Sequence, residues 1–194
     1  VFAYANMNGN KATLNVETNI INEYGSSGSY SVSTYLTGRA GNRIAVSKEQ
    51  TIALNVLQEK TIKQTIAVNN PIVWSLENPY LYRVVVELKQ NGKTIDQQKL
   101  RFGFRTIEIK PNGVFLNGKH IKIYGTNNHQ DHAGVGSALP DYLQYYRIGL
   151  LKEMGVNAYR TSHNAPTPEL LDACDSLGML VMDEQRLLNS GAEY

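Results

Sequence analysis

Hydrophobic and polar residues alternate with a period of two through the first half of the chain. Apolar or β-branched side chains occupy most alternate positions in five segments, residues 12–20, 29–36, 60–68, 81–89 and 99–105. Such alternation is typical of strands that bury one face and expose the other. We therefore expect antiparallel strands in which Leu14, Val16 and Ile20, among others, point into a shared core.

Turn and breaker residues fall between these strands. Asn91 and Gly92 form the kind of dipeptide that closes a two-residue hairpin. Pro71 and Pro79 flank a stretch without alternation, and because proline cannot donate a backbone hydrogen bond, this stretch fits an irregular crossover rather than a central strand. Strands at this spacing predict one immunoglobulin-like β-sandwich over residues 1–107.

The pattern changes after residue 107. A short hairpin around Asn117-Gly118 leads into a strand predicted at residues 121–126, and further strands are predicted at residues 157–162 and 179–184. Helix-like segments separate the three strands. The order β-α-β-α-β predicts a parallel sheet with right-handed crossovers. We assign residues 108–194 to this second, α/β domain.

The two helices carry start and stop signals. The first is predicted to begin at Asp141, its N-cap, and to end at Gly155. The second is predicted to begin after the N-cap Thr167 and to end at Gly178. Apolar residues of the first helix that recur at a spacing of three or four, and so predict its buried face, are Leu143, Tyr146, Leu150 and Met154.

A polar cluster follows each of the three predicted parallel strands. The clusters are "NNHQDH" (127–132), "RTSHN" (160–164) and "DEQR" (183–186). Parallel strands place their carboxyl ends at one edge of the sheet, where α/β barrels and doubly wound sheets build their sites. We therefore expect the three clusters to converge on one site.

Composition and charge narrow the classes of function. The 194-residue chain has a formal net charge of +2 and no run of Lys or Arg, which argues against nucleic acid as a partner. Its single cysteine, Cys174, excludes an internal disulfide and lies at an apolar helical position typical of a core. No stretch approaches the roughly 18 apolar residues of a membrane span, so we expect no membrane partner. The chain begins at Val1 within a strand and stops at Tyr194 without an evident element, and we expect both ends to be cut.

The first cluster admits three interpretations. His129 and His132 flank Asp131, and with His163 they could ligate Zn²⁺ or non-haem iron. A hydrated loop whose side chains cap local backbone is the second. The third, which we favour, is a set of donors and acceptors for a polyhydroxylated ligand, to which Asn128 would also contribute. On this interpretation we expect neither a metal nor a cofactor.

The second and third clusters supply charges at the same edge. Arg160 should be partly buried and so needs an acceptor, and Asp183 or Glu184 on the third strand is its natural partner in an ion pair at the rim. His163 is expected to face the open site. No pair of carboxylates suited to acid and base catalysis is evident in the chain.

Several stretches resemble glycoside hydrolase family 2. "WSLENPYLY" (74–82) and "FGFRTIEI" (102–109) resemble the end of that family's immunoglobulin-like domain. Residues 118–184 resemble the opening of its catalytic barrel in the β-galactosidase branch. The segment "NAYRTSHNAP" (157–166) is the most specific, because several residues recur together there. The resemblance is strong over residues 74–186 and weaker before them.

The resemblance implies an immunoglobulin-like β-sandwich followed by the first β-α-β-α-β of a TIM barrel, which is incomplete because three strands cannot close a barrel of eight. It also implies a retaining exo-β-glycosidase acting on terminal β-galactosides. The acid/base and nucleophile glutamates of such an enzyme follow the fourth and seventh barrel strands, beyond Tyr194, so this chain alone is expected to be inactive.

The resemblance also assigns individual residues. His129 and His163 match the family's substrate-contacting histidines, Arg160 matches its rim arginine, and His132 matches a further loop histidine. The β-glucuronidases of the family carry "H-E-D" in this loop, so "HQDH" (129–132) favours a β-galactoside or related oligosaccharide as the ligand.

Two other functions stay open from the residues alone. One is a metal-dependent hydrolase on a barrel, and the other is a non-catalytic carbohydrate-binding or scaffold module. The first and third parallel strands would also be open edges, and unpaired strand edges favour self-association.

Overall fold

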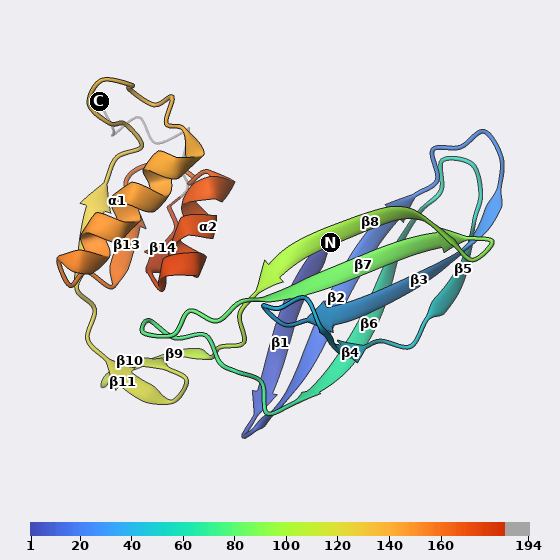
Figure 1. The fold of residues 1–194 in the computed structure, drawn as a ribbon, viewed down its shortest axis with the longest axis horizontal. Coiled ribbons are helices and arrows are strands. Elements are labelled where there is room, and N and C mark those ends of the chain that lie inside the picture. The colour runs from blue at the N-terminus through green and yellow to red at the C-terminus, as the bar shows by residue number, and fades with distance from the viewer. Residues whose placement is uncertain (185–194) are drawn as a thin grey trace. The chain divides into compact units, whose positions relative to one another are not determined.

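The computed structural model describes residues 1–184, and these residues form two compact units (Figure 1). The first unit contains Val1–Val73 and Tyr80–Arg105. The second contains Trp74–Pro79 and, in the described part of the chain, residues 106–184. The segment 74–79 therefore belongs to the second unit, although it lies in sequence between strands of the first.

Two antiparallel sheets build the first unit. One has the strand order β1-β2-β6, and the other has the order β4-β3-β7-β8 with β5 also paired to β3. The strands are β1 Phe2–Asn8, β2 Lys11–Ile21, β3 Gly28–Thr37, β4 Arg43–Val46, β5 Gln50–Leu54, β6 Glu59–Asn69, β7 Tyr82–Gln90 and β8 Lys93–Phe102. This arrangement confirms the predicted immunoglobulin-like β-sandwich, including the irregular crossover between β6 and β7.

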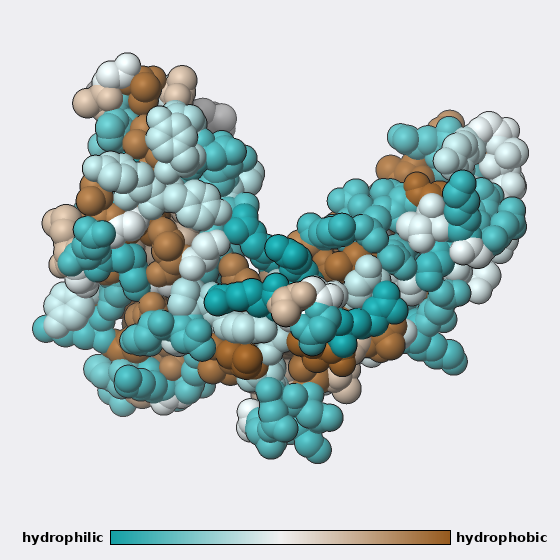
Figure 2. Space-filling view, viewed as in Figure 1, coloured by the Kyte–Doolittle hydropathy of each residue, from teal (hydrophilic) through white to brown (hydrophobic). Residues whose placement is uncertain are grey.

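The core of the sandwich follows the period-two pattern. Leu14 and Val16 of β2 are buried, as are Val32 of β3 and Val84 of β7, while alternate residues of β2 face outward. The surface of the sandwich visible in Figure 2 is accordingly mostly hydrophilic. Burial of apolar side chains from both sheets is the main force that holds them together.

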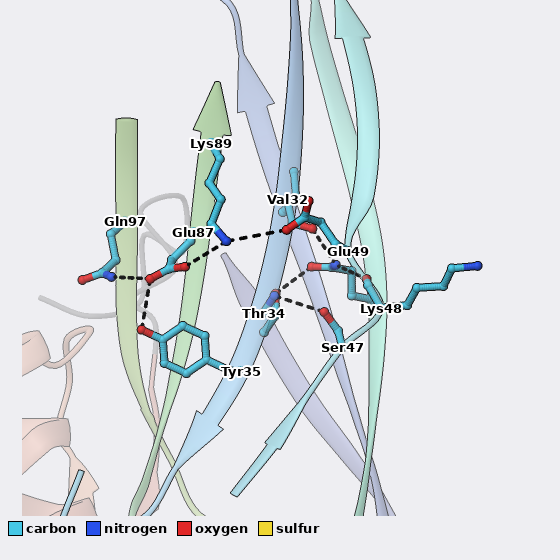
Figure 3. A network of polar contacts seen from close by, with 10 residues as sticks. Val32, Thr34, Tyr35, Ser47, Lys48, Glu49, Glu87, Lys89 and Gln97 are labelled. Carbon is cyan, nitrogen blue, oxygen red and sulfur yellow. Dashed lines mark hydrogen bonds and ion pairs between the residues drawn. The ribbon is translucent and has the colours of Figure 1, made fainter. Parts of the chain in front are cut away.

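Gln64 of β6 carries an amide into this core and joins the two sheets. Its side chain is buried; Oε1 accepts a hydrogen bond from the Thr34 hydroxyl at 2.7 Å, and Nε2 donates to the carbonyls of Val32 at 3.1 Å and Lys48 at 3.0 Å. Figure 3 shows the backbone N–H of Thr34 donating to the Ser47 hydroxyl in the same network. Because these groups are paired, the polar network is compatible with the interior.

The second unit contains a small antiparallel sheet and a parallel sheet. The antiparallel sheet consists of β9 Ile107–Lys110, β10 Gly113–Leu116 and β11 Lys119–Ile121, with the predicted turn at Asn117-Gly118. The parallel sheet has the order β12-β13-β14, formed by Gly125–Asn128, Ala158–Thr161 and Leu180–Met182. Helices α1 Asp141–Glu153 and α2 Pro168–Leu177 connect these strands, which confirms the predicted β-α-β-α-β order. Neither of these two helices has the length and apolar character needed to cross a bilayer.

Three local predictions for this unit are wrong. The first parallel strand begins at Gly125 rather than at residue 121, because Ile121 ends the preceding hairpin strand. Asp141 is not the N-cap of α1, because Pro140 takes that position. Asp141 lies in the first turn, where a negative charge interacts favourably with the helix dipole. The predicted buried face of α1 is also incorrect, because Tyr146, Leu150 and Met154 are exposed, whereas Ile148 is buried.

The signals at α2 are confirmed. The Thr167 hydroxyl accepts a hydrogen bond from the backbone N–H of Leu170, and Gly178 takes the left-handed conformation at the end of the helix. Cys174 lies in the core between α1, α2 and β13. Burial raises the pKa of its thiol to about 12, so the thiol stays protonated and does not provide a nucleophilic thiolate.

The segment 74–79 packs against the carboxyl end of α2 and donates a hydrogen bond to it. Trp74 is buried, and its Nε1 donates to the carbonyl of Asp175 at 2.7 Å. Lys152 Nζ donates to the carbonyls of Gly178 at 2.8 Å and Leu76 at 3.0 Å. The last carbonyls of a helix have no partner within it, so the Trp74 indole supplies the missing hydrogen bond at Asp175. Lys152 of α1 joins the residue after the helix, Gly178, to Leu76.

Removal of the Gln64 amide should destabilise the sandwich. Gln64→Leu leaves the Thr34 hydroxyl and the carbonyls of Val32 and Lys48 without this partner in the core, which should lower the free energy of unfolding by roughly 2–4 kcal/mol. Urea denaturation followed by far-UV circular dichroism measures the change. Lys63→Leu, at the neighbouring outward-facing position, is the control and should unfold at nearly the parental urea concentration. Equal midpoints for Gln64→Leu and the parent would contradict the role assigned to the amide.

Two helix-ending glycines offer a matched comparison. Gly178 and Gly155 both have positive φ, at +77° and +84°. A Cβ at Gly178 would collide with the Leu76 carbonyl, whereas a Cβ at Gly155 meets no atom within 4 Å among the described residues. Gly155→Ala should therefore cost only the backbone penalty of about 1 kcal/mol, and Gly178→Ala should cost clearly more. Thermal denaturation of both variants measures the difference, and similar melting temperatures would rule out the close packing of residues 74–79 on Gly178.

Candidate functional site

The parallel strands end at one edge, and polar residues that follow them meet there. His129 comes directly after β12, and His163 lies in the loop after β13. Their ring centroids are 5.8 Å apart, with the ring planes at 76°. Glu184 follows β14, and its Oε1 lies 3.0 Å from Nδ1 of His163. The convergence expected from the parallel order is confirmed for these three residues.

Glu184 contacts three residues of the neighbouring strand and its loop. Its Oε2 forms an ion pair with Arg160 Nη2 at 2.8 Å, and its Oε1 binds His163. Its backbone N–H donates to the hydroxyl of the buried Thr161 at 2.9 Å. Arg160 therefore pairs with Glu184, one of the two predicted partners, while Asp183 is exposed. Contacts to both its carboxylate and its backbone N–H therefore fix the position of Glu184.

The two asparagines at the end of β12 make different contacts. Asn127 Oδ1 accepts a hydrogen bond from Arg160 Nη1 at 3.2 Å. Asn128 Nδ2 instead donates to the carbonyl and hydroxyl of Thr126, at 3.1 and 2.8 Å, within its own strand. Sequence reasoning selected Asn128 and passed over Asn127. Strand alternation sends adjacent side chains to opposite faces, so only the pairing register could have distinguished them.

Residues 132–136, in the loop after β12, form a local turn. The backbone N–H of His132 donates to the carbonyl of Gly136 at 2.9 Å, and His132 Nδ1 lies 2.9 Å from the carbonyl of Ala133. Asp131 is exposed beside this turn. His132 and Asp131 are thus engaged in or next to a local turn, and no described contact joins them to the cluster of His129, His163 and Glu184.

Two residues that sequence reasoning missed support the loops. Arg147 of α1 donates from Nη2 to the carbonyl of His129 at 3.0 Å. Gln130 Nε2 donates to the carbonyl of Ala165 at 2.6 Å and so ties the loop after β12 to the loop after β13. A helical arginine has no signal in the sequence that marks such a contact. Gln130 stood within the polar cluster, but its partner is distant in the chain.

The carboxyl edge of the parallel sheet presents both hydrogen-bond donors and hydrogen-bond acceptors. Two imidazoles, a guanidinium and a carboxylate lie together, and side chains of these types can bind the hydroxyls of a polar ligand in fixed directions. Among residues 1–184, no group of three His, Cys, Asp or Glu side chains is placed to hold a metal ion. Gln185 and Arg186, the other members of the third predicted cluster, lie outside the described residues.

Comparisons with known proteins give consistent matches. The profile described as Glycosyl hydrolases family 2 matches residues 1–105, and that described as Glycosyl hydrolases family 2, TIM barrel domain, matches residues 107–193. A β-galactosidase of Bacteroides ovatus is 34% identical over 175 residues, which are 90% of this chain and 20% of that protein. A β-glucuronidase of Formosa agariphila is 30% identical over 185 residues, 93% of this chain and 19% of that protein.

Solved structures agree with these matches. The crystal structure of a glycosyl hydrolase family 2 member from Bacteroides cellulosilyticus superimposes with a TM-score of 0.90 at 35% sequence identity, and covers 95% of this chain and 24% of that one. The chain thus spans about a quarter or less of the length of these relatives. Because family profiles match both units and the solved fold is the same, the chain belongs to glycosyl hydrolases family 2.

Proposed function

We propose that this chain is part of a retaining exo-β-glycosidase that acts on terminal β-galactosides, and that it supplies groups which position the sugar. The observation that carries the proposal is the convergence of His129, His163 and Glu184 at the carboxyl edge of the parallel sheet. Active sites of α/β barrels are built at this edge. The acid/base and nucleophile glutamates of such an enzyme are assigned to parts of the protein outside this chain.

His163 is oriented for this role by Glu184. An ionised carboxylate only accepts hydrogen bonds, so its 3.0 Å contact with Nδ1 places a ring proton on that nitrogen. In the neutral ring, Nε2 is then an acceptor for a sugar hydroxyl. His129, whose ring stands edge to face with that of His163, offers a second imidazole to the same ligand.

Glu184 fits a positioning role better than that of the acid or the nucleophile. Oε2 lies 2.8 Å from Arg160 Nη2 in an ion pair without hydrogen-bond geometry, and Oε1 lies 3.0 Å from His163 Nδ1. A retaining enzyme needs a second carboxyl group about 5 Å from the first, with both free to reach the glycosidic bond. We therefore assign Glu184 to the support of Arg160 and His163.

The charged side chains at the carboxyl edge of the parallel sheet favour a neutral sugar as the ligand. A uronic acid carries a carboxylate, and its recognition calls for a cationic side chain with free donors. The guanidinium of Arg160 already pairs with Glu184 and donates to Asn127. The relatives include proteins named β-galactosidase and β-glucuronidase, so this pairing is the local feature from which we infer a galactoside.

Loss of either imidazole should slow hydrolysis in the full-length protein. His129→Ala and His163→Ala should each lower kcat/KM for p-nitrophenyl β-galactoside by the equivalent of about 2–4 kcal/mol, because a positioned hydrogen bond to the sugar is lost in the transition state. The matched control is His120→Ala on β11, whose ring packs on Phe115 and should leave kcat/KM nearly unchanged. Near-parental kcat/KM in both site variants would refute these roles.

The full-length protein should hydrolyse a neutral glycoside faster than an anionic one. Hydrolysis of p-nitrophenyl β-galactoside should proceed with a higher kcat/KM than hydrolysis of p-nitrophenyl β-glucuronide, because the uronate carboxylate would approach Glu184 while Arg160 is already paired. Initial-rate kinetics with the two substrates measure the ratio. A preference for the glucuronide would keep the glycosidase class and overturn the galactoside assignment.

A further inference from the structure

Gln130 links the two loops that carry His129 and His163. It directly follows His129 in the chain, and its Nε2 donates to the carbonyl of Ala165 at 2.6 Å, across a separation of 35 residues in sequence. Ala165 lies two residues after His163, in the loop between β13 and α2. Within residues 1–184, no other hydrogen bond joins these two loops.

The loop after β13 is held at its two ends by bonds of its own. The backbone N–H groups of Ser162 and Asn164 donate to carbonyls at the end of β13, and the Thr167 hydroxyl caps α2. Ala165 lies between these two anchors. The amide of Gln130 therefore holds the part of the loop that the local bonds do not reach.

Arg147 anchors the other loop from α1. Its half-buried side chain donates from Nη2 to the carbonyl of His129 at 3.0 Å. Gln130 and Arg147 also line a cavity of about 60 Å³, together with Tyr159 and Leu170 among others. This volume admits water but no organic ligand. Because side chains leave this space unfilled, the loop is fixed here by hydrogen bonds rather than by close packing.

We propose that Gln130 is a positioning residue that holds the imidazoles of His129 and His163 at one fixed separation for the sugar. Their ring centroids are 5.8 Å apart. Glu184 orients the ring of His163, whereas Gln130 fixes the backbone of one histidine loop against that of the other. A ligand that bonds to both rings binds and reacts best when their separation is set in advance, because ordering a loop on binding costs free energy. Since the two rings contact the sugar only under the proposed function, this inference rests on that function.

Kinetics of the full-length protein test this role. Gln130→Met keeps the length of the side chain and removes its donor. It should lower kcat/KM for p-nitrophenyl β-galactoside by roughly 10-fold to 100-fold, mainly through kcat, because misplaced groups lose contacts in the transition state. The melting temperature should stay near the parental value, since the bond is exposed to water, which competes for it.

Two further variants separate the hydrogen bond from the bulk of the side chain. Gln130→Lys keeps N–H donors on a chain of similar reach and should recover most of the parental kcat/KM. Gln98→Met, at an exposed position of β8, is the matched control and should leave kcat/KM unchanged. A parental kcat/KM in Gln130→Met would overturn the proposal.

Ring signals of the carbon-13-histidine-labelled chain report on the same role without any substrate. The chain has four histidines, and single alanine variants assign each signal. In Gln130→Met the signals of His129 and His163 should both shift, because each ring lies in the ring-current field of the other. The signal of His120, whose ring packs on Phe115, should stay in place.

This second measurement distinguishes the two proposals. A parental protein that does not hydrolyse the galactoside would refute the proposed function, and the ring signals would then decide the role of Gln130. Unmoved signals of both His129 and His163 in Gln130→Met would overturn that role even in an active galactosidase.

Discussion

Parallel pairing of β12 with β13, and of β13 with β14, makes three segments that are far apart in sequence end at the same edge of one sheet. The register is as important as the pairing. Asn127 lies directly opposite Arg160, which explains the hydrogen bond between their side chains. A slip of one residue would turn Arg160 to the other face and break its ion pair with Glu184. The cluster of imidazole, guanidinium and carboxylate groups thus depends on backbone hydrogen bonds between three short strands.

Buried polar groups in this protein differ in whether a hydrogen-bond partner is in place for them. The amide of Gln64 lies in the sandwich core with its partners in place, so its presence is accounted for by the structure alone. Thr161 is similar, because its hydroxyl accepts from the backbone of Glu184. Thr18 differs, since its hydroxyl is buried without a partner among the described residues. A paired polar group contributes to folding, whereas an unpaired one lowers stability.

Much of the architecture could be predicted because its signals are local. Period-two alternation marked the sandwich strands, the Asn-Gly dipeptides marked hairpins, and Thr167 and Gly178 marked the limits of α2. Helix α1 resisted the same approach. Its apolar residues surround most of the helix, so a spacing of three or four fits two faces equally well. Packing against Tyr159 and α2 buried Ile148 and left Tyr146 and Met154 exposed. The rotation of the helix is therefore a property of its contacts rather than of its own sequence.

By itself, the sequence determined the order of elements, the parallel sense of the second sheet and the edge at which its polar clusters meet, because periodicity, turn residues and crossover handedness act over short stretches of chain. Only the tertiary structure decided which side chains form the cluster. It paired Arg160 with Glu184 rather than Asp183, selected Asn127 over Asn128, and placed His132 in a local turn. It also revealed that Arg147 and Gln130 hold the loops. Such choices depend on register and on contacts between distant segments, and neither leaves a mark in a local pattern.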